Sequence, residues 1–208
     1  MYPLIIQTIA LPNGKMRLYA PEPVATQHLY NKAKLIAPLT PFPFWAKIWA
    51  SSLAMAVFLQ THPEWITNRR VAEFGAGLGL PSLAIAPMAK DIWCSDQVDE
   101  AVFTLQKNIG LHGFFNMEAA VCDWKNFTAC GEPQVVLMSD VNYSAEAFPD
   151  LERLLEYFLS KSIPVILTTP QRLIAKPFLH KILPIVGLQK EMEIGKDKER
   201  ISLFILGV

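Results

Sequence analysis

The chain has 208 residues, of which 51% are apolar and 18% charged, and its 19 basic residues equal its 19 acidic residues in number. This composition predicts one large domain with a true core and excludes a disordered chain. Zero formal net charge argues against a nucleic-acid partner held by a general basic field. The three cysteines include no CxxC pair, which excludes a disulfide framework and disfavours a metal site.

The sequence has no evident targeting or membrane-spanning segment. The apolar N-terminus, residues 1–10, lacks the basic residues that precede the apolar part of a signal peptide, and a strand is expected there. The longest uncharged apolar run, residues 48–59, is shorter than the ~18 residues that indicate a spanning helix. We therefore expect a cytoplasmic protein without a membrane partner.

The first 43 residues are rich in proline and are expected to form an extension that precedes the main fold. Asn13-Gly14 lies between two β-prone runs, residues 4–11 and 15–19. These features predict a hairpin, because both turn positions tolerate the positive φ of a tight turn. Aromatic and aliphatic residues at helical spacing then predict a helix over residues 44–60.

From residue 70 onward, short apolar runs alternate with helical patterns, which predicts βαβ units around a parallel sheet. The predicted strands are 71–75, 91–95, 119–122, 134–139 and 163–168, and the predicted helices are 81–89, 98–111 and 147–159. Two further β-prone runs, 183–194 and 201–206, predict a C-terminal antiparallel hairpin. The expected fold is therefore α/β, with a mixed seven-strand sheet, an N-terminal hairpin and helix, and a single domain over residues 1–208.

A glycine-rich loop, Glu73-Phe74-Gly75-Ala76-Gly77-Leu78-Gly79, follows the first of these strands. Glycines allow a tight turn and let a ligand approach the backbone. The dinucleotide fingerprint needs its third glycine at position 80, which is Leu80 here, so a dinucleotide oxidoreductase is the least favoured function. A tight turn without a ligand is the structural alternative.

Polar and aromatic residues also end the next two predicted strands. Asp96 lies about 20 residues after the glycine loop, where an acid commonly binds ribose hydroxyls, although it could instead cap the following helix. Asp123 and Trp124 offer an acceptor for an amino group and a flat face for a ring; a loop acid and a core tryptophan are the alternative. Because the carboxyl ends of parallel strands meet at one edge of a sheet, we expect these residues to share one site.

Three segments together resemble class I S-adenosylmethionine-dependent methyltransferases, and more narrowly methyltransferase family 16, the lysine methyltransferase-like branch of the seven-β-strand enzymes. They are the tryptophan-rich residues 44–54, the glycine-loop residues 71–80, and Ser139-Asp140-Val141-Asn142-Tyr143 with its acid-x-x-aromatic motif. The resemblance covers about residues 40–170. It implies a Rossmann-like fold, S-adenosyl-L-methionine as cofactor, and a cofactor-binding and catalytic core over residues 44–208.

The residues and the resemblance together give an expected set of site residues. Asp140 and Tyr143 are expected to be catalytic and to face the methyl acceptor. Ala50 departs from the family, which often has proline after the tryptophan. The expected cofactor-binding residues are Trp49, Glu73, Gly75, Ala76, Gly77, Gly79, Asp96, Asp123, Trp124 and Ser139.

The resemblance implies methyl transfer to a lysine of a protein partner. The alternatives are a small-molecule nitrogen or oxygen acceptor, or a cofactor-binding module that no longer transfers methyl groups. Making a lysine amine neutral at pH 7 costs roughly 4–5 kcal/mol in water, and an apolar wall lowers that cost. We expect Trp45 and Tyr143 to form the wall, Asp140 to orient the amine, and the protein to be a monomer with no nucleic-acid partner.

Overall fold

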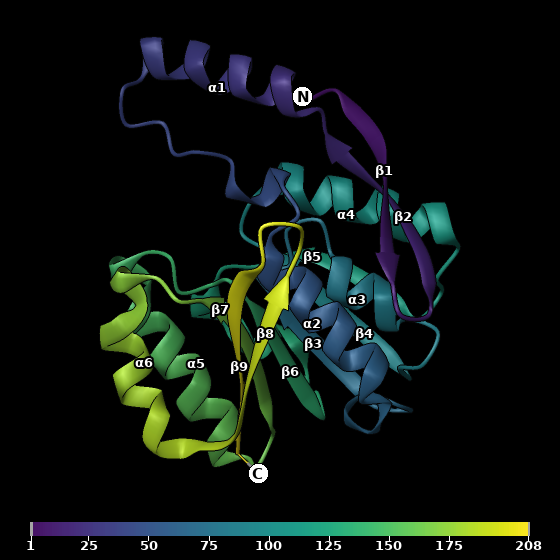
Figure 1. Cartoon of the computed structure of the whole chain (residues 1–208), viewed down its shortest axis with the longest axis vertical. Coiled ribbons are helices and arrows are strands. Elements are labelled where there is room, and N and C mark those ends of the chain that lie inside the picture. The colour runs from purple at the N-terminus through teal and green to yellow at the C-terminus, as the bar shows by residue number, and fades with distance from the viewer. Residues whose placement is uncertain (1, 208) are drawn as a thin grey trace.

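The computed structural model describes residues 2–207, and a seven-stranded sheet forms its centre (Figure 1). The strand order is β5-β4-β3-β6-β7-β9-β8. The strands are β3 (Arg70–Phe74), β4 (Asp91–Asp96), β5 (Met117–Val121), β6 (Val135–Ser139), β7 (Val165–Pro170), β8 (Val186–Ile194) and β9 (Glu199–Leu206). The first five are parallel, whereas β9 runs antiparallel to both β7 and β8. The predicted mixed α/β sheet is confirmed.

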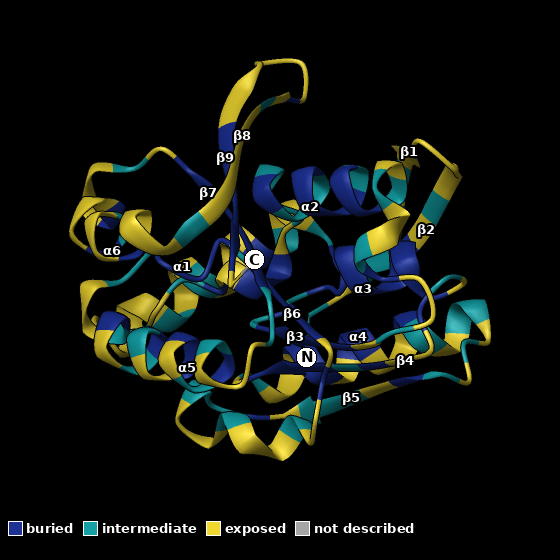
Figure 2. Ribbon diagram, turned by 90° about the horizontal axis from the view of Figure 1, so that it is seen from below, coloured by how far each residue is buried: buried dark blue, intermediate teal, exposed yellow. Residues whose placement is uncertain are grey.

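Helices cover both faces of the sheet because the central strands are apolar on both sides. Along β6, Val135 and Leu137 belong to one core cluster, whereas Val136 and Met138 belong to the other. The first cluster holds buried side chains of α2, α3 and α4, and the second holds those of α5 and α6 (Figure 2). The helices are α1 (Pro23–Ile36), α2 (Ala50–Thr61), α3 (Leu80–Ile85), α4 (Asp99–His112), α5 (Phe148–Ser160) and α6 (Lys176–Ile182).

The N-terminal hairpin pairs β1 (Leu4–Leu11) with β2 (Gly14–Pro21), as the Asn13-Gly14 turn predicted. Asn108 of α4 holds it against the core. The buried amide of Asn108 accepts a hydrogen bond from the Tyr19 backbone N–H at 2.6 Å and donates to the carbonyls of Tyr19 and Leu78 at 3.1 and 3.2 Å. One side chain therefore ties the hairpin to the glycine loop.

Two helices of the structure were not predicted. In α1, the Glu22 carboxylate caps the first turn and Pro23 occupies the first helical position, a start signal that the density of prolines around it obscures. The second helix, α6, follows Pro170, and the predicted strand over 183–194 begins only at Val186.

The predicted helix over residues 44–60 is wrong in its first part. Phe44–Ala46 form a 3₁₀ turn, the chain is extended from Lys47, and α2 begins at Ala50. The turn is held by the Trp49 indole N–H, which donates to the Phe44 carbonyl at 2.7 Å.

Within residues 2–207, none of the helices has both the length and the apolar character needed to cross a membrane.

Candidate active site

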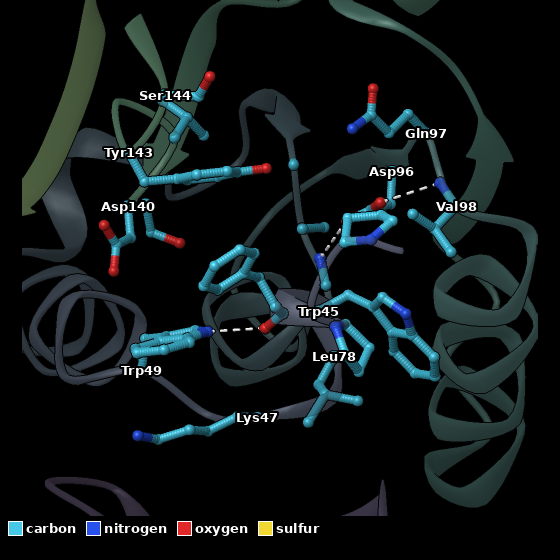
Figure 3. Close-up of a pocket in the computed structure, with 18 of the residues that line it drawn as sticks. Trp45, Lys47, Trp49, Leu78, Asp96, Gln97, Val98, Asp140, Tyr143 and Ser144 are labelled. Atoms are coloured by element: carbon cyan, nitrogen blue, oxygen red, sulfur yellow. Dashed lines mark hydrogen bonds between the residues drawn. The ribbon is translucent and has the colours of Figure 1, made fainter. Parts of the chain in front are cut away.

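A cavity of about 930 Å³ opens at the carboxyl ends of β3, β4 and β6, within the size range of small-molecule pockets (Figure 3). The segment that follows α1 supplies a further wall through all of its residues from Thr40 to Trp49 except Ala46, together with Arg172 after β7. All of the expected site residues except Glu73 line it: Trp49, Gly75, Ala76, Gly77, Gly79, Asp96, Asp123, Trp124, Ser139, Asp140 and Tyr143.

The glycine loop is pressed between the strand ends and the cavity. Gly75 has a φ of +66°, and a Cβ there would lie 3.0 Å from Val141 Cγ1 and 3.6 Å from the Trp124 ring. Only glycine combines that backbone conformation with so little space. Gly79 has a different constraint, because a Cβ at that position would collide with the buried Leu105 side chain of α4. The lack of a side chain at Gly75 therefore leaves room for Val141 and Trp124 at the cavity wall, and the lack of one at Gly79 allows α4 to pack against the loop.

Asp96 joins the glycine loop to the end of β4. Its Oδ2 accepts from the Gly77 N–H and its Oδ1 accepts from the Val98 N–H, both at 3.0 Å. Burial raises the pKa of Asp96, and the amide hydrogen bonds oppose that rise. Each carboxylate oxygen can accept a second hydrogen bond. Asp96 therefore does not cap α4, whose N-cap is Val98 without a side-chain hydrogen bond, but fixes the backbone just before the helix and keeps acceptor capacity for a vicinal diol.

Asp123 and Trp124 close the same end of the cavity. The Asp123 carboxylate accepts from the Lys125 N–H at 3.1 Å and starts a short 3₁₀ segment. That segment directs the Trp124 indole over Gly75. An aromatic face and a carboxylate thus lie next to the glycine loop.

Glu73 lies in a different position from the one expected. It is fully buried and absent from the cavity wall, and its Oε2 accepts hydrogen bonds from both the backbone N–H, at 3.2 Å, and the hydroxyl of Ser82. Its Oε1 has no hydrogen-bond partner among the described residues. Burial raises the pKa of Glu73 to about 7. The residue joins β3 to α3 behind the loop, so its link to the cavity is indirect.

Asp140 occupies the opposite side of the cavity and is paired with Arg172. The guanidinium makes a bidentate contact, with Nη2 donating to Oδ2 at 2.9 Å and Nη1 donating to Oδ1. Burial raises the pKa of Asp140, whereas Arg172 and the more distant Lys47 lower it. Arg172 was missed by the sequence reasoning. The available signal was a cation four residues after the predicted strand 163–168, at the edge where the other site residues gather.

Tyr143 faces an aromatic wall that differs from the expected one. Its ring packs on Phe44 with centroids 5.1 Å apart, and Phe44 in turn lies 6.0 Å from the Trp49 ring. Trp45 instead packs edge-on against Tyr2 at 5.5 Å, on the far side of the cavity from Tyr143 (Figure 3). The expectation for Trp45 was wrong because the 3₁₀ turn directs neighbouring side chains in different directions.

The wall also carries positive charge. Lys47 Nζ lies 4.3 Å from the centroid of the Trp49 ring, and the Arg172 guanidinium carbon lies 5.8 Å from it. Burial raises the pKa of Tyr143, and the nearby Asp96 and Asp140 carboxylates raise it further, so its phenol stays neutral near pH 7. The cavity therefore has two halves. The polar half consists of the glycine loop, Asp96, Asp123 and Trp124. The aromatic half consists of Phe44, Trp49 and Tyr143 beside the Asp140 carboxylate, which is paired with Arg172.

A family model described as lysine methyltransferase matches residues 44–183. Among curated proteins, the chain is similar to methyltransferase-like protein 22 of Mus musculus, with 24% identity over 50% of this chain and 27% of that protein. It is also similar to protein N-lysine methyltransferase METTL21A of Xenopus tropicalis, with 22% identity over 61% of each chain. The matched part of the chain thus spans less than two thirds of either relative.

Solved structures support the same fold. An rRNA methylase from Streptococcus thermophilus aligns with a TM-score of 0.58 and 12% identity, over 77% of this chain and 98% of that chain. The TrmK protein of M. capricolum, solved with S-adenosyl-homocysteine, aligns with a TM-score of 0.54 and 14% identity, over 72% and 66%. At 12% and 14% identity, the similarity to these two structures shows a shared fold and nothing more.

The buried Glu73 generates a prediction about stability and pH. The native carboxyl keeps its proton up to about pH 7, whereas the unfolded one loses it near its ordinary pKa of 4.5. The free energy of unfolding should therefore fall as pH rises between these values. Glu73→Gln cannot titrate, so its stability relative to wild type should grow by roughly 3 kcal/mol between pH 4 and 8.

Urea unfolding at several pH values measures this difference. Glu199→Gln, at an exposed position, is the matched control and should follow the wild-type pH dependence. Parallel pH dependences for wild type and Glu73→Gln would show that the Glu73 carboxyl is not protonated in the native protein.

Proposed function

We propose that this chain, which belongs to the lysine methyltransferase family through residues 44–183, transfers a methyl group to the side-chain amine of a lysine in a protein partner. The family makes the chain an S-adenosylmethionine-dependent methyltransferase; the lysine acceptor and the protein partner are the proposal. The observation that carries it is the division of one cavity into a polar half and an aromatic half with a single paired carboxylate.

The polar half fits the cofactor. Gly75 and Gly77 line the cavity, and a Cβ at Gly75 would meet its neighbours. The Asp96 carboxylate has acceptor capacity left for a ribose diol, and Asp123 with Trp124 would hold the adenine. Ser139 and the rest of the loop would complete that wall, and Trp49 would contact the cofactor from the aromatic half. S-adenosylmethionine supplies a sulfonium methyl that is open to nucleophilic displacement.

The aromatic half suits an amine that must be neutral before it attacks. Phe44, Trp49 and Tyr143 would exclude water around it, and an apolar surrounding disfavours the ammonium form. The nearby cations Lys47 and Arg172 also disfavour an added positive charge. The amine would therefore give its proton to water as it enters, before these side chains enclose it, and no dedicated base in the protein would be needed.

Asp140 would then orient the neutral amine. Its carboxylate charge is balanced by Arg172, and each oxygen can still accept a hydrogen bond from an N–H of the acceptor. Such a bond would direct the nitrogen lone pair toward the methyl carbon, which is an orientation effect. Arg172 is a positioning residue in this account, because it acts through Asp140.

The alternative acceptor is a small molecule with a nitrogen or oxygen nucleophile. A cavity of about 930 Å³ is near the upper end of the usual range for small ligands, so cofactor and a small acceptor could share it. Against this alternative, the name of the METTL21A relative describes a protein N-lysine methyltransferase, at 22% identity.

Asp140→Asn should lower methyl transfer roughly 100-fold, which is the usual loss when one preorganised polar contact of a transition state is removed. Purified protein and tritiated S-adenosylmethionine are incubated with a lysate of cells that lack this chain, and label is counted in protein bands and in the small-molecule filtrate. Cofactor binding by the variant should stay within about twofold of wild type, because Asp140 lies in the aromatic half.

Asp150→Asn is the matched control, since Asp150 also lines the cavity but pairs with Lys125 and Arg153 at 4.0 and 3.6 Å. A labelled lysine in a protein band, lost in Asp140→Asn and kept in Asp150→Asn, is the expected result. Label in the filtrate alone would assign a small-molecule acceptor. Full turnover by Asp140→Asn would exclude the orienting role.

Arg172→Met should move the acid limb of the pH profile of methyl transfer to higher pH. Arg172 lowers the pKa of Asp140, so its removal leaves the carboxyl protonated over a wider range. The loss of a cation also makes the acceptor amine harder to deprotonate, which moves the limb in the same direction. Arg172→Lys should restore part of the shift, and an unchanged limb in Arg172→Met would contradict the positioning role.

A further inference from the structure

The N-terminal arm, defined here as residues 22–43, carries an uneven share of charge. Residues 22–43 contain two lysines and one glutamate, and together with the preceding hairpin the first 43 residues contain four basic residues and one acidic residue, a formal charge of +3 in a chain whose total is zero. The single acid, Glu22, is already used, because its carboxylate accepts from the Val24 and Ala25 N–H groups at 3.1 and 2.6 Å. The arm therefore has no carboxylate available to its own lysines.

Two of those lysines lie on α1 without an ionic partner. Lys32 and Lys34 are exposed, and within residues 2–207 no ion pair includes either of them. Lys34 Nζ lies 5.8 Å from the centroid of the Tyr30 ring, a contact that does not neutralise its charge. This face of the protein is thus complementary to an acidic surface.

The arm also exposes large apolar side chains. Leu35, Ile36 and Leu39 are 86%, 80% and 96% exposed, and Val24 is 77% exposed. The only buried residue of α1 is Thr26. A helix of 14 residues is marginal in water without tertiary packing. Because burying such aliphatic side chains is favourable, α1 would gain from an apolar partner.

The arm leads directly to the aromatic half of the cavity. Tyr30 of α1 contacts Phe42 with ring centroids 5.2 Å apart, and Phe42 contacts Phe44 at 5.3 Å. Phe44 in turn packs on Tyr143. Thr40–Phe44 line the cavity, and α1 itself stands clear of the layers that cover the sheet (Figure 1). A molecule bound to α1 would therefore lie beside the acceptor side of the cavity.

We propose that the N-terminal arm is the docking surface for the protein that carries the acceptor lysine, and that it takes a segment of that protein in which apolar side chains lie beside carboxylates. This inference rests on the proposed function. A second copy of the chain would bring a like-charged arm. A nucleic acid would meet aliphatic side chains and only two lysines, whereas such partners are held by many cations and by aromatic stacking.

Two sets of exposed substitutions test the arm separately. The first is Leu35→Ser, Ile36→Ser and Leu39→Ser combined, and the second is Lys32→Glu with Lys34→Glu. The matched control is Ile185→Ser with Lys90→Glu, which changes the same residue types at exposed positions just before β8 and β4, at the amino ends of these two strands and outside the cavity wall. Circular dichroism and binding of S-adenosylhomocysteine should be the same for all of these proteins.

The assay uses the same lysate and tritiated cofactor, with the lysate protein varied over a wide concentration range. Both arm variants should raise the KM for the labelled protein at least tenfold and leave kcat unchanged, while the control matches wild type. Added salt should raise the wild-type KM and have little effect on Lys32→Glu with Lys34→Glu. A short peptide around the labelled lysine should be methylated equally by all of the proteins.

The contrary outcomes separate this inference from the proposed function. Protein labelling that is lost in Asp140→Asn but unaltered in both arm variants would overturn the docking surface and leave the proposed function in place. Label confined to small molecules would overturn both. Label in a band that ribonuclease removes would assign a nucleic-acid partner and also overturn both.

Discussion

The hydrogen bond from the Gly77 N–H to the Asp96 carboxylate, at 3.0 Å, is the constraint on which the site depends. It fixes the turn after β3 to the end of β4, and the same carboxylate accepts from Val98 at the start of α4. Ala76 adds a backbone bond to the Ser95 carbonyl at 2.8 Å. One buried acid thus joins the glycine loop, the end of β4 and the residue that precedes α4.

The two buried acids of the cavity are balanced in different ways. Burial raises the pKa of both Asp96 and Asp140. Backbone amides stabilise the Asp96 carboxylate, and their positions are fixed by the fold. A side-chain guanidinium that is one third exposed stabilises Asp140. The first arrangement suits a permanent binding site, and the second suits a group whose partner can adjust when an acceptor arrives.

Local patterns were enough to predict the sheet and most of the cavity wall. The glycine loop and the polar residues Asp96, Asp123 and Asp140 all follow short apolar runs, and parallel strands bring such residues to one edge. The direction of each strand was enough to place the glycine loop, Asp96, Asp123 and Trp124, whereas Trp49, Ser139, Asp140 and Tyr143 were expected from the family resemblance. Their cofactor contacts stay a prediction.

Features that depend on long-range packing could not be read from the sequence. The pairing of Asp140 with Arg172 joins residues 32 positions apart. Phe44 rather than Trp45 faces Tyr143 because of a 3₁₀ turn that looked like the first turn of a helix. Glu73 precedes the loop in sequence, yet its contact is with Ser82 at the start of α3 and not with the cavity.

The family model matches most of the core of the protein but not the N-terminal arm. The family model begins at residue 44, where the N-terminal arm ends. The residues expected to bind the cofactor and orient the acceptor all lie within the matched region, whereas the exposed apolar and basic surface of α1 lies outside it. Chemistry and partner choice would thus be carried by different parts of the chain.

The most direct test of the central claim is calorimetric titration of S-adenosylhomocysteine into wild type, Asp96→Ala and Asp99→Asn. Wild type and Asp99→Asn, which changes an exposed acid at the start of α4, should bind one equivalent with the same affinity. Asp96→Ala should bind at least tenfold more weakly, because hydrogen bonds to a charged group contribute about 1.5–3 kcal/mol. Undiminished binding by a folded Asp96→Ala protein, or no binding by wild type, would contradict the account.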